Sequence, residues 1–91
     1  MKYSVVFSKE ALRELKKMDR YTASLILGWV RKNLEGCEDP RIHGKGLTAN
    51  YSGKWRYRVG DYRLLAEIQD DKVVILVLRV AHRSEVYNQP L

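Results

Sequence analysis

The sequence predicts an α+β fold in which a helical hairpin packs on a mostly antiparallel four-stranded sheet, in the order β-α-α-β-β-β. Three observations lead to this prediction. Two segments near the N-terminus repeat apolar residues at helical spacing, later segments are short β-rich runs, and tight-turn dipeptides separate those runs. The 91 residues suffice for one small domain, residues 1–91, with one modest core.

The first half of the chain is predicted to form one strand and two helices. Residues 2–7 contain the β-rich run Tyr-Ser-Val-Val-Phe, and Ser8 then caps a helix. A second helix is expected over about residues 21–34, ended by Gly36 and Pro40. Apolar residues recur at helical spacing on both helices: Ala11, Leu12, Leu15 and Met18 on the first, and Leu25, Ile26, Trp29 and Val30 beside Thr22 on the second. These stripes are predicted to cover one face of the sheet.

The second half is predicted to be a loop followed by three strands. Residues 40–53 form the loop, and the strands run over about residues 51–59, 62–69 and 72–80. Gly60-Asp61 and Asp70-Asp71 are the expected tight turns, with Gly60 supplying a positive φ. Residues 73–78 are all apolar, which is typical of a central strand covered on both faces.

Cations alternate strictly with Trp55, Tyr57 and Val59 from residue 54 to residue 59. In a strand, Lys54, Arg56 and Arg58 therefore share one face, and the aromatic residues take the other. A two-residue turn at Gly60-Asp61 places Arg58 directly opposite Arg63. Like charges that face each other across a ladder are destabilising, and an anion between them would relieve the repulsion.

Phosphate is the expected anion, because guanidinium groups bind it bidentately. The alternative is that Arg56, Arg58 and Arg63 form a solvated outer face. For Lys54 we favour a structural reading, a cross-strand ion pair with Glu67.

The composition limits the classes of molecule that the protein is expected to bind. The net charge of +6 favours a polyanionic partner, although a basic surface without a target has the same charge. The single cysteine, Cys37, cannot form an internal disulfide, which indicates a reducing, cytoplasmic setting. No apolar run is long enough to cross a bilayer, so no membrane partner is expected. His43 has no second ligand at metal-binding spacing, and we predict neither a metal nor a cofactor.

The C-terminal segment adds His82, Arg83 and Tyr87 beyond the last predicted strand. We expect the strand ends to bring them near the arginines. His82 is the nearby side chain whose ordinary pKa permits proton transfer near neutral pH. An arginine-rich site with one histidine and one tyrosine suits RNA cleavage without a metal, by attack of the 2′-OH on the adjacent phosphate. Alternatively, Tyr87 anchors the tail on the core.

The chain resembles the RelE/ParE superfamily of bacterial and archaeal toxins, and specifically its RelE-like ribonuclease branch. The resemblance rests on Phe7-Ser8, on the segment Trp-Arg-Tyr-Arg-Val-Gly-Asp-Tyr-Arg at residues 55–63, and on His82-Arg83 followed by Val86-Tyr87. It covers essentially the whole chain. It implies a single RelE-like toxin of a type II toxin–antitoxin pair, which cuts mRNA on the ribosome and leaves a 2′,3′-cyclic phosphate and a 5′-hydroxyl.

The resemblance also implies residue roles. Arg56 and Arg58 take the two basic strand positions, which are lysines in the best-known member, and Arg63 binds phosphate. Arg83 assists the leaving group, and Tyr87 stacks on or orients the substrate. Arginine cannot act as a general base, so we expect His82 to take over proton transfer and His82→Ala to cost about two or more orders of magnitude. The expected RNA-binding residues are Lys45, Lys54, Arg56 and Arg63.

The implied partners are a cognate acidic antitoxin, the ribosome and its mRNA, and operator DNA only as the toxin–antitoxin complex. Two alternatives remain open from the sequence. One is a ParE-like inhibitor of DNA gyrase without nuclease activity, although that branch generally lacks the paired arginines. The other is a non-catalytic RNA-binding module.

Overall fold

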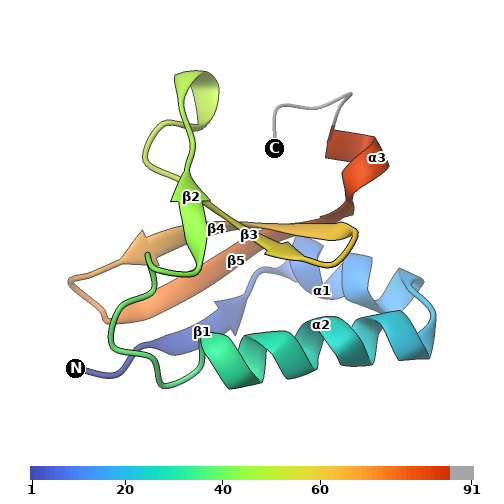
Figure 1. The fold of residues 1–91 in the computed structure, drawn as a ribbon, viewed down its shortest axis with the longest axis horizontal. Helices are drawn as coiled ribbons and strands as arrows, with labels where there is room; N and C mark the ends of the chain where they lie inside the picture. The colour runs from blue at the N-terminus through green and yellow to red at the C-terminus, as the bar shows by residue number, and fades with distance from the viewer. Residues whose placement is uncertain (87–91) are drawn as a thin grey trace.

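A computed structural model describes residues 1–86, which form one five-stranded sheet with helices (Figure 1). The sheet order is β1-β5-β4-β3-β2, in which β1 pairs parallel with β5 and every other pair is antiparallel. The strands are β1 Ser4–Phe7, β2 Gly44–Gly46, β3 Trp55–Val59, β4 Tyr62–Gln69 and β5 Val74–His82. The predicted fold class and the mostly antiparallel sheet are confirmed, but the prediction of four strands is wrong by one.

The additional strand, β2, lies inside the segment predicted to be a loop. It pairs antiparallel with β3, with Lys45 opposite Arg56. Its two glycines permit this pairing, because a Cβ at Gly44 would come 2.4 Å from the Arg56 carbonyl oxygen and one at Gly46 would come 2.9 Å from the Trp55 ring. Next in the chain, η1 (Ala49–Tyr51) is a 3₁₀ turn, so β3 begins at Trp55 and not near residue 51.

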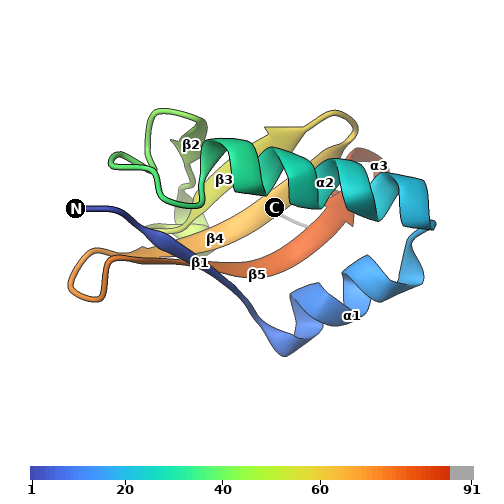
Figure 2. The same ribbon diagram turned by 90° about the horizontal axis from the view of Figure 1, so that it is seen from below.

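Two antiparallel helices cover one face of the sheet (Figure 2). Helix α1 spans Lys9–Lys17 and begins where predicted, since the Ser8 hydroxyl accepts the Ala11 N–H at 3.1 Å. Helix α2 spans Arg20–Asn33 and is capped by Asp19, a capping residue that we did not predict. The φ of +78° at Gly36 agrees with the predicted end of this helix.

The main core lies between these helices and the sheet. It is formed by Ala11, Leu15, Ile26, Val30, Leu34, Tyr57, Leu64, Ala66, Ile75, Val77 and Val80. The predicted stripes are correct at most positions, but Leu12 and Leu25 are 45% and 55% exposed because they lie at the outer margins of their helices. The buried Tyr57 hydroxyl donates to the Pro40 carbonyl at 2.6 Å, and burial raises the pKa of Tyr57.

The opposite face of the sheet carries no long helix among the described residues. A small cluster lies there, in which Leu65 and Ala81 are packed by Leu47, Tyr51 and Leu78. On this side Figure 1 shows η1 and a short helix that the sequence did not predict, α3 (Arg83–Val86). Strand β5 is central, as predicted, but it is covered by long helices on one face only.

Candidate functional site

The β3–β4 hairpin has the predicted register and brings two arginines together. Val59 pairs with Tyr62, so Arg58 lies directly opposite Arg63, and Gly60 in the turn has a φ of +58°. Tyr57 points into the core, and alternation therefore places Arg58 and Arg63 on the face away from α1 and α2. We call this surface the arginine face: Lys45, Lys54, Arg56, Arg58 and Arg63.

Arg56 lies at the centre of the arginine face. It is paired with Lys45 on β2 and with Leu65 on β4. With Arg58, it borders a shallow pocket of about 220 Å³, which is also lined by Ile42, His43, Gly44 and Lys45. Its Nε atom is buried and has no hydrogen-bond partner within residues 1–86. A buried donor of this kind usually has a partner, so a ligand that supplies an acceptor would satisfy it.

The hairpin turn contacts both Arg63 and Arg83. The Arg63 guanidinium donates through Nη1 to the carbonyls of Gly60 and Tyr62, both at 3.0 Å. The Arg83 N–H donates to the Asp61 carbonyl at 2.7 Å, and the Arg83 Nε lies 3.6 Å from the Asp61 carboxylate. The sequence predicts Asp61 only as part of the tight turn. In the structure it also joins α3 to the end of the hairpin.

The imidazole of His82 lies on the wrong side of the sheet for the role that we expected. His82 is the last residue of β5 and pairs with Tyr62, and the two rings meet edge to face with centroids 5.2 Å apart. Tyr62 packs on the core side, so the imidazole lies on the helix side of the sheet. The expectation that it lies beside the arginines is wrong, because β5 continues two residues further than predicted and its alternation turns His82 away. A role in proton transfer stays a prediction, without support from this placement.

Two further predicted residues remain to be placed. Lys54 lies 4.0 Å from Glu67 across the hairpin, as the structural interpretation predicted, so its charge is partly neutralised. Tyr87 lies outside the described residues.

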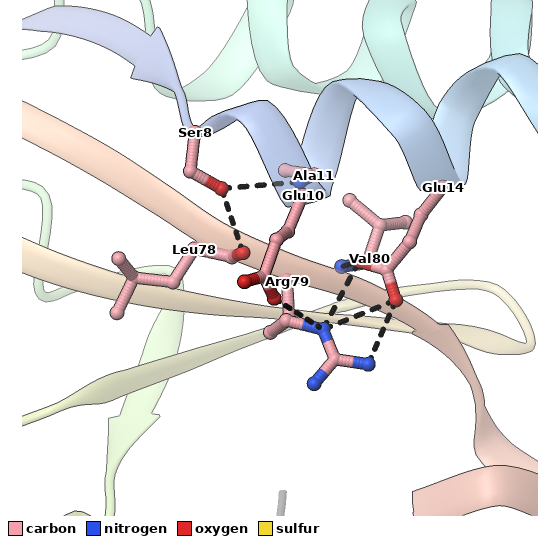
Figure 3. Close-up of polar contacts among 7 residues, drawn as sticks. All are labelled: Ser8, Glu10, Ala11, Glu14, Leu78, Arg79 and Val80. Atoms are coloured by element: carbon pink, nitrogen blue, oxygen red, sulfur yellow. Dashed lines mark hydrogen bonds and ion pairs between the residues drawn. The ribbon is translucent and has the colours of Figure 1, made fainter.

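Arg79 is a cation near this face that was not predicted as a site residue. It pairs with Leu65 on β4, but its guanidinium turns past the edge of β5 and donates to both carboxylate oxygens of Glu14 on α1, at 2.9–3.2 Å (Figure 3). Glu14 also accepts the Val80 N–H at 2.8 Å, and it raises the pKa of Arg79. The sequence does contain a signal for it, because Arg79 is a single cation within an otherwise apolar strand. The ion pair gives Arg79 a structural role.

Within residues 1–86, no group of three or more His, Cys, Asp or Glu side chains is arranged to hold a metal ion. None of the helices in that part of the chain has the length and apolar character needed to cross a membrane.

Comparison with known proteins gives one consistent family. Residues 5–87 match the family described as the ParE toxin of the type II toxin–antitoxin system parDE. The chain is similar to Toxin RelG of Mycobacterium tuberculosis, with 32% identity that covers 98% of this chain and 100% of RelG. It is also similar to the mRNA interferase toxin RelE of Escherichia coli, with 35% identity that covers 98% of this chain and 94% of RelE.

Solved structures have the same fold. The toxin–antitoxin complex RelBE2 from Mycobacterium tuberculosis contains a chain that matches with a TM-score of 0.82 and 31% identity, covering 91% of this chain and all of that one. A mutant of Escherichia coli RelE in the free state matches with a TM-score of 0.71 and 27% identity, covering 98% and 94%.

Proposed function

The chain belongs to the RelE/ParE family of type II toxin–antitoxin toxins, and from this premise we propose that it is a ribosome-dependent endoribonuclease that cleaves mRNA and so inhibits translation. The observation that carries the proposal is the direct opposition of Arg58 and Arg63 on a sheet face that also exposes Lys45. Like charges in this register destabilise a strand ladder, whereas an RNA phosphate between them would be bound bidentately.

The proposed reaction is an in-line transfer at one phosphodiester. The 2′-oxygen forms a bond to phosphorus, the bond from phosphorus to the 5′-oxygen breaks, and the products are a 2′,3′-cyclic phosphate and a 5′-hydroxyl. Arg56, Arg58 and Arg63 would stabilise the charge that develops on the phosphorane, and Arg83 would assist the leaving oxygen. Tyr87 would stack on a base or orient the substrate. The proton of the 2′-OH has to go to a group other than these arginines, which stay protonated.

We propose that a cognate acidic antitoxin restrains this activity by covering the basic surface. The net charge of +6 supports an acidic partner, and solved relatives have been crystallised as toxin–antitoxin complexes. Operator DNA would be bound only by the toxin–antitoxin complex. Lys45 and Lys54 would contact RNA outside the cleaved phosphate, and these contacts would make ribosome binding sensitive to salt.

The test is to map cut sites by primer extension on a defined message, with and without translating ribosomes. Wild-type toxin should create discrete new 5′ ends on translated message, and Arg63→Ala should lower the rate by about two orders of magnitude. The matched control is Arg31→Ala, which removes an exposed arginine from α2 on the other side of the sheet. Equal rates for Arg63→Ala and wild type would show that the wrong face was assigned to RNA.

The same experiment addresses the two alternatives. DNA breaks with intact message would indicate a ParE-like gyrase inhibitor. Ribosome binding without any cleavage by the wild type would indicate an RNA-binding module. A nuclease instead requires that Arg63→Ala lose cleavage while it retains ribosome affinity.

A further inference from the structure

His82 makes its polar contacts with α3. Its Nδ1 atom accepts the N–H of Ser84 at 3.1 Å and lies 2.8 Å from the Ser84 hydroxyl. Since α3 begins at Arg83, His82 occupies the N-cap position, and its ring nitrogen takes the place of the usual Ser, Asp or Asn oxygen. The N–H of Ser84 can donate only to an Nδ1 lone pair, so this contact makes Nδ1 the acceptor of the cap.

A cap matters more to α3 than to a long helix. The four residues of α3 make one turn, so its first N–H groups have no acceptor inside the helix. The structure provides two acceptors from outside. The Arg83 N–H donates to the Asp61 carbonyl at 2.7 Å, and the next N–H, that of Ser84, donates to His82. These two bonds fix the backbone on both sides of the Arg83 Cα.

The His82 ring is itself held in place from the helix side. It packs edge to face on Tyr62, with an interplanar angle of 89°. It also borders a pocket of about 470 Å³ between the ends of α1 and β5, which is lined by Glu14, Lys17, Asp19 and Glu85 among others. The ring therefore cannot swing toward the arginine face while it keeps both its Tyr62 and Ser84 contacts.

We propose that His82 is a positioning residue, whose Nδ1 atom caps α3 and thereby fixes Arg83 relative to Arg63 at the hairpin turn. This inference rests on the proposed nuclease function for its effect on rate, but the cap itself does not depend on that function. It is an alternative to the expectation from the sequence that His82 transfers the proton, which stays a prediction. The two roles predict opposite results for conservative variants.

Three substitutions separate the cap, the ring contact and the proton-transfer role. His82→Asn keeps a capping acceptor but loses the ring and the titratable nitrogen. His82→Phe keeps a ring against Tyr62 but loses the acceptor, and His82→Ala loses both. If His82 acts as a cap, His82→Asn should be close to wild type in Ser84 amide protection and in cleavage rate. His82→Phe and His82→Ala should both be impaired in these two properties.

The first measurement is amide–water exchange at Ser84 by NMR, which requires no RNA. We expect His82→Asn to be within about twofold of wild type, and His82→Phe and His82→Ala to exchange about fivefold faster. Equal exchange in all four proteins, or fast exchange in His82→Asn, would overturn the cap.

The second measurement is the cleavage rate of translated mRNA with the same four proteins. A cap predicts near wild-type cleavage by His82→Asn and a loss of about fivefold in His82→Phe and His82→Ala. A proton-transfer role predicts that all three lose about 10² or more, and this result would refute the positioning role. A wild-type protein that cleaves nothing would refute the proposed nuclease, while the Ser84 amide would still decide whether His82 is a cap.

Discussion

The cations of the β3–β4 hairpin have different neighbours at its two ends. Away from the turn, Lys54 lies 4.0 Å from Glu67, and nearby Arg41 pairs with Asp70 at 2.9 Å while its guanidinium lies over the Trp55 ring. At the turn, Arg58 lies opposite Arg63, and no ion pair within residues 1–86 involves Arg58. The paired end is explained by folding alone. At the turn end, Arg58 has no ion pair within residues 1–86 and shares its register position with another arginine, and this difference is the basis of the proposed anionic ligand.

The largest effect should come from Arg58→Ala at the turn end. We expect mRNA cleavage to fall by about 10²-fold, because one group that stabilises the phosphorane is lost. The free energy of unfolding should not fall, and relief of the like-charge pair could raise it by about 0.2–1 kcal/mol. Initial cleavage rates and urea denaturation measure the two quantities. Full activity combined with lower stability would mean that Arg58 belongs with the structural cations.

Tyr57→Phe should have the opposite profile, since Tyr57 is the core-facing neighbour of Arg58. Its hydroxyl donates to the Pro40 carbonyl at 2.6 Å, and removing it leaves that buried acceptor without its partner. The free energy of unfolding should fall by about 1–3 kcal/mol. The cleavage rate per folded molecule should stay at the wild-type value. A specific loss of cleavage in fully folded protein would break the proposed separation between the two faces.

Glu14→Gln tests the ion pair of Arg79, a cation that has a carboxylate partner although it lies close to the arginine face. The amide can still accept the Val80 N–H, but the charge opposite Arg79 is lost. With the Arg79 side chain 34% exposed, solvent screens the pair, so we expect a loss of about 0.5–1 kcal/mol in urea denaturation. The control is Glu10→Gln, because Glu10 is 4.0 Å from Arg79 and 68% exposed, and it should change almost nothing.

The smallest effect should come from Asp70→Asn at the paired end, and it should depend on pH. Hydrogen bonds from Arg41 and Tyr3 hold the pKa of Asp70 below its ordinary value. A carboxylate whose pKa is lower in the folded than in the unfolded protein stabilises the fold at a pH above its unfolded pKa of about 3.9. This contribution to the free energy of unfolding is lost as the pH falls through the folded-state pKa. Denaturation should therefore show a small loss for the variant at pH 7 that shrinks at acid pH. A loss that grows on acidification would contradict the pKa assignment.

Much of the fold could be predicted because its determinants are local. The spacing of Ala11 and Leu15, the cap at Ser8 and the turn at Gly60 each act over a few residues, and the structure confirms all of them. The opposition of Arg58 and Arg63 was predictable for the same reason. A two-residue turn and the alternation of a strand are enough to fix it.

The parts that could not be predicted depend on contacts between distant segments. Gly-Lys-Gly has the composition of a loop, and it becomes β2 because Trp55 and the Arg56 backbone lie against its glycines. The last two residues of β5 remain in the sheet because Ala81 and His82 pair with Arg63 and Tyr62. That pairing decides on which face the imidazole lies.

The sequence by itself therefore determined the α+β class, the helical hairpin and a row of cations on one face of a strand, because periodicity and turn chemistry are short-range properties. Only the tertiary structure decided that Arg79 pairs with Glu14, that His82 lies on the helix side, and that α3 is attached to the hairpin turn through Asp61. Ion pairing and strand ends depend on which distant residues come within a few ångströms of each other. No local pattern in the sequence contains that information.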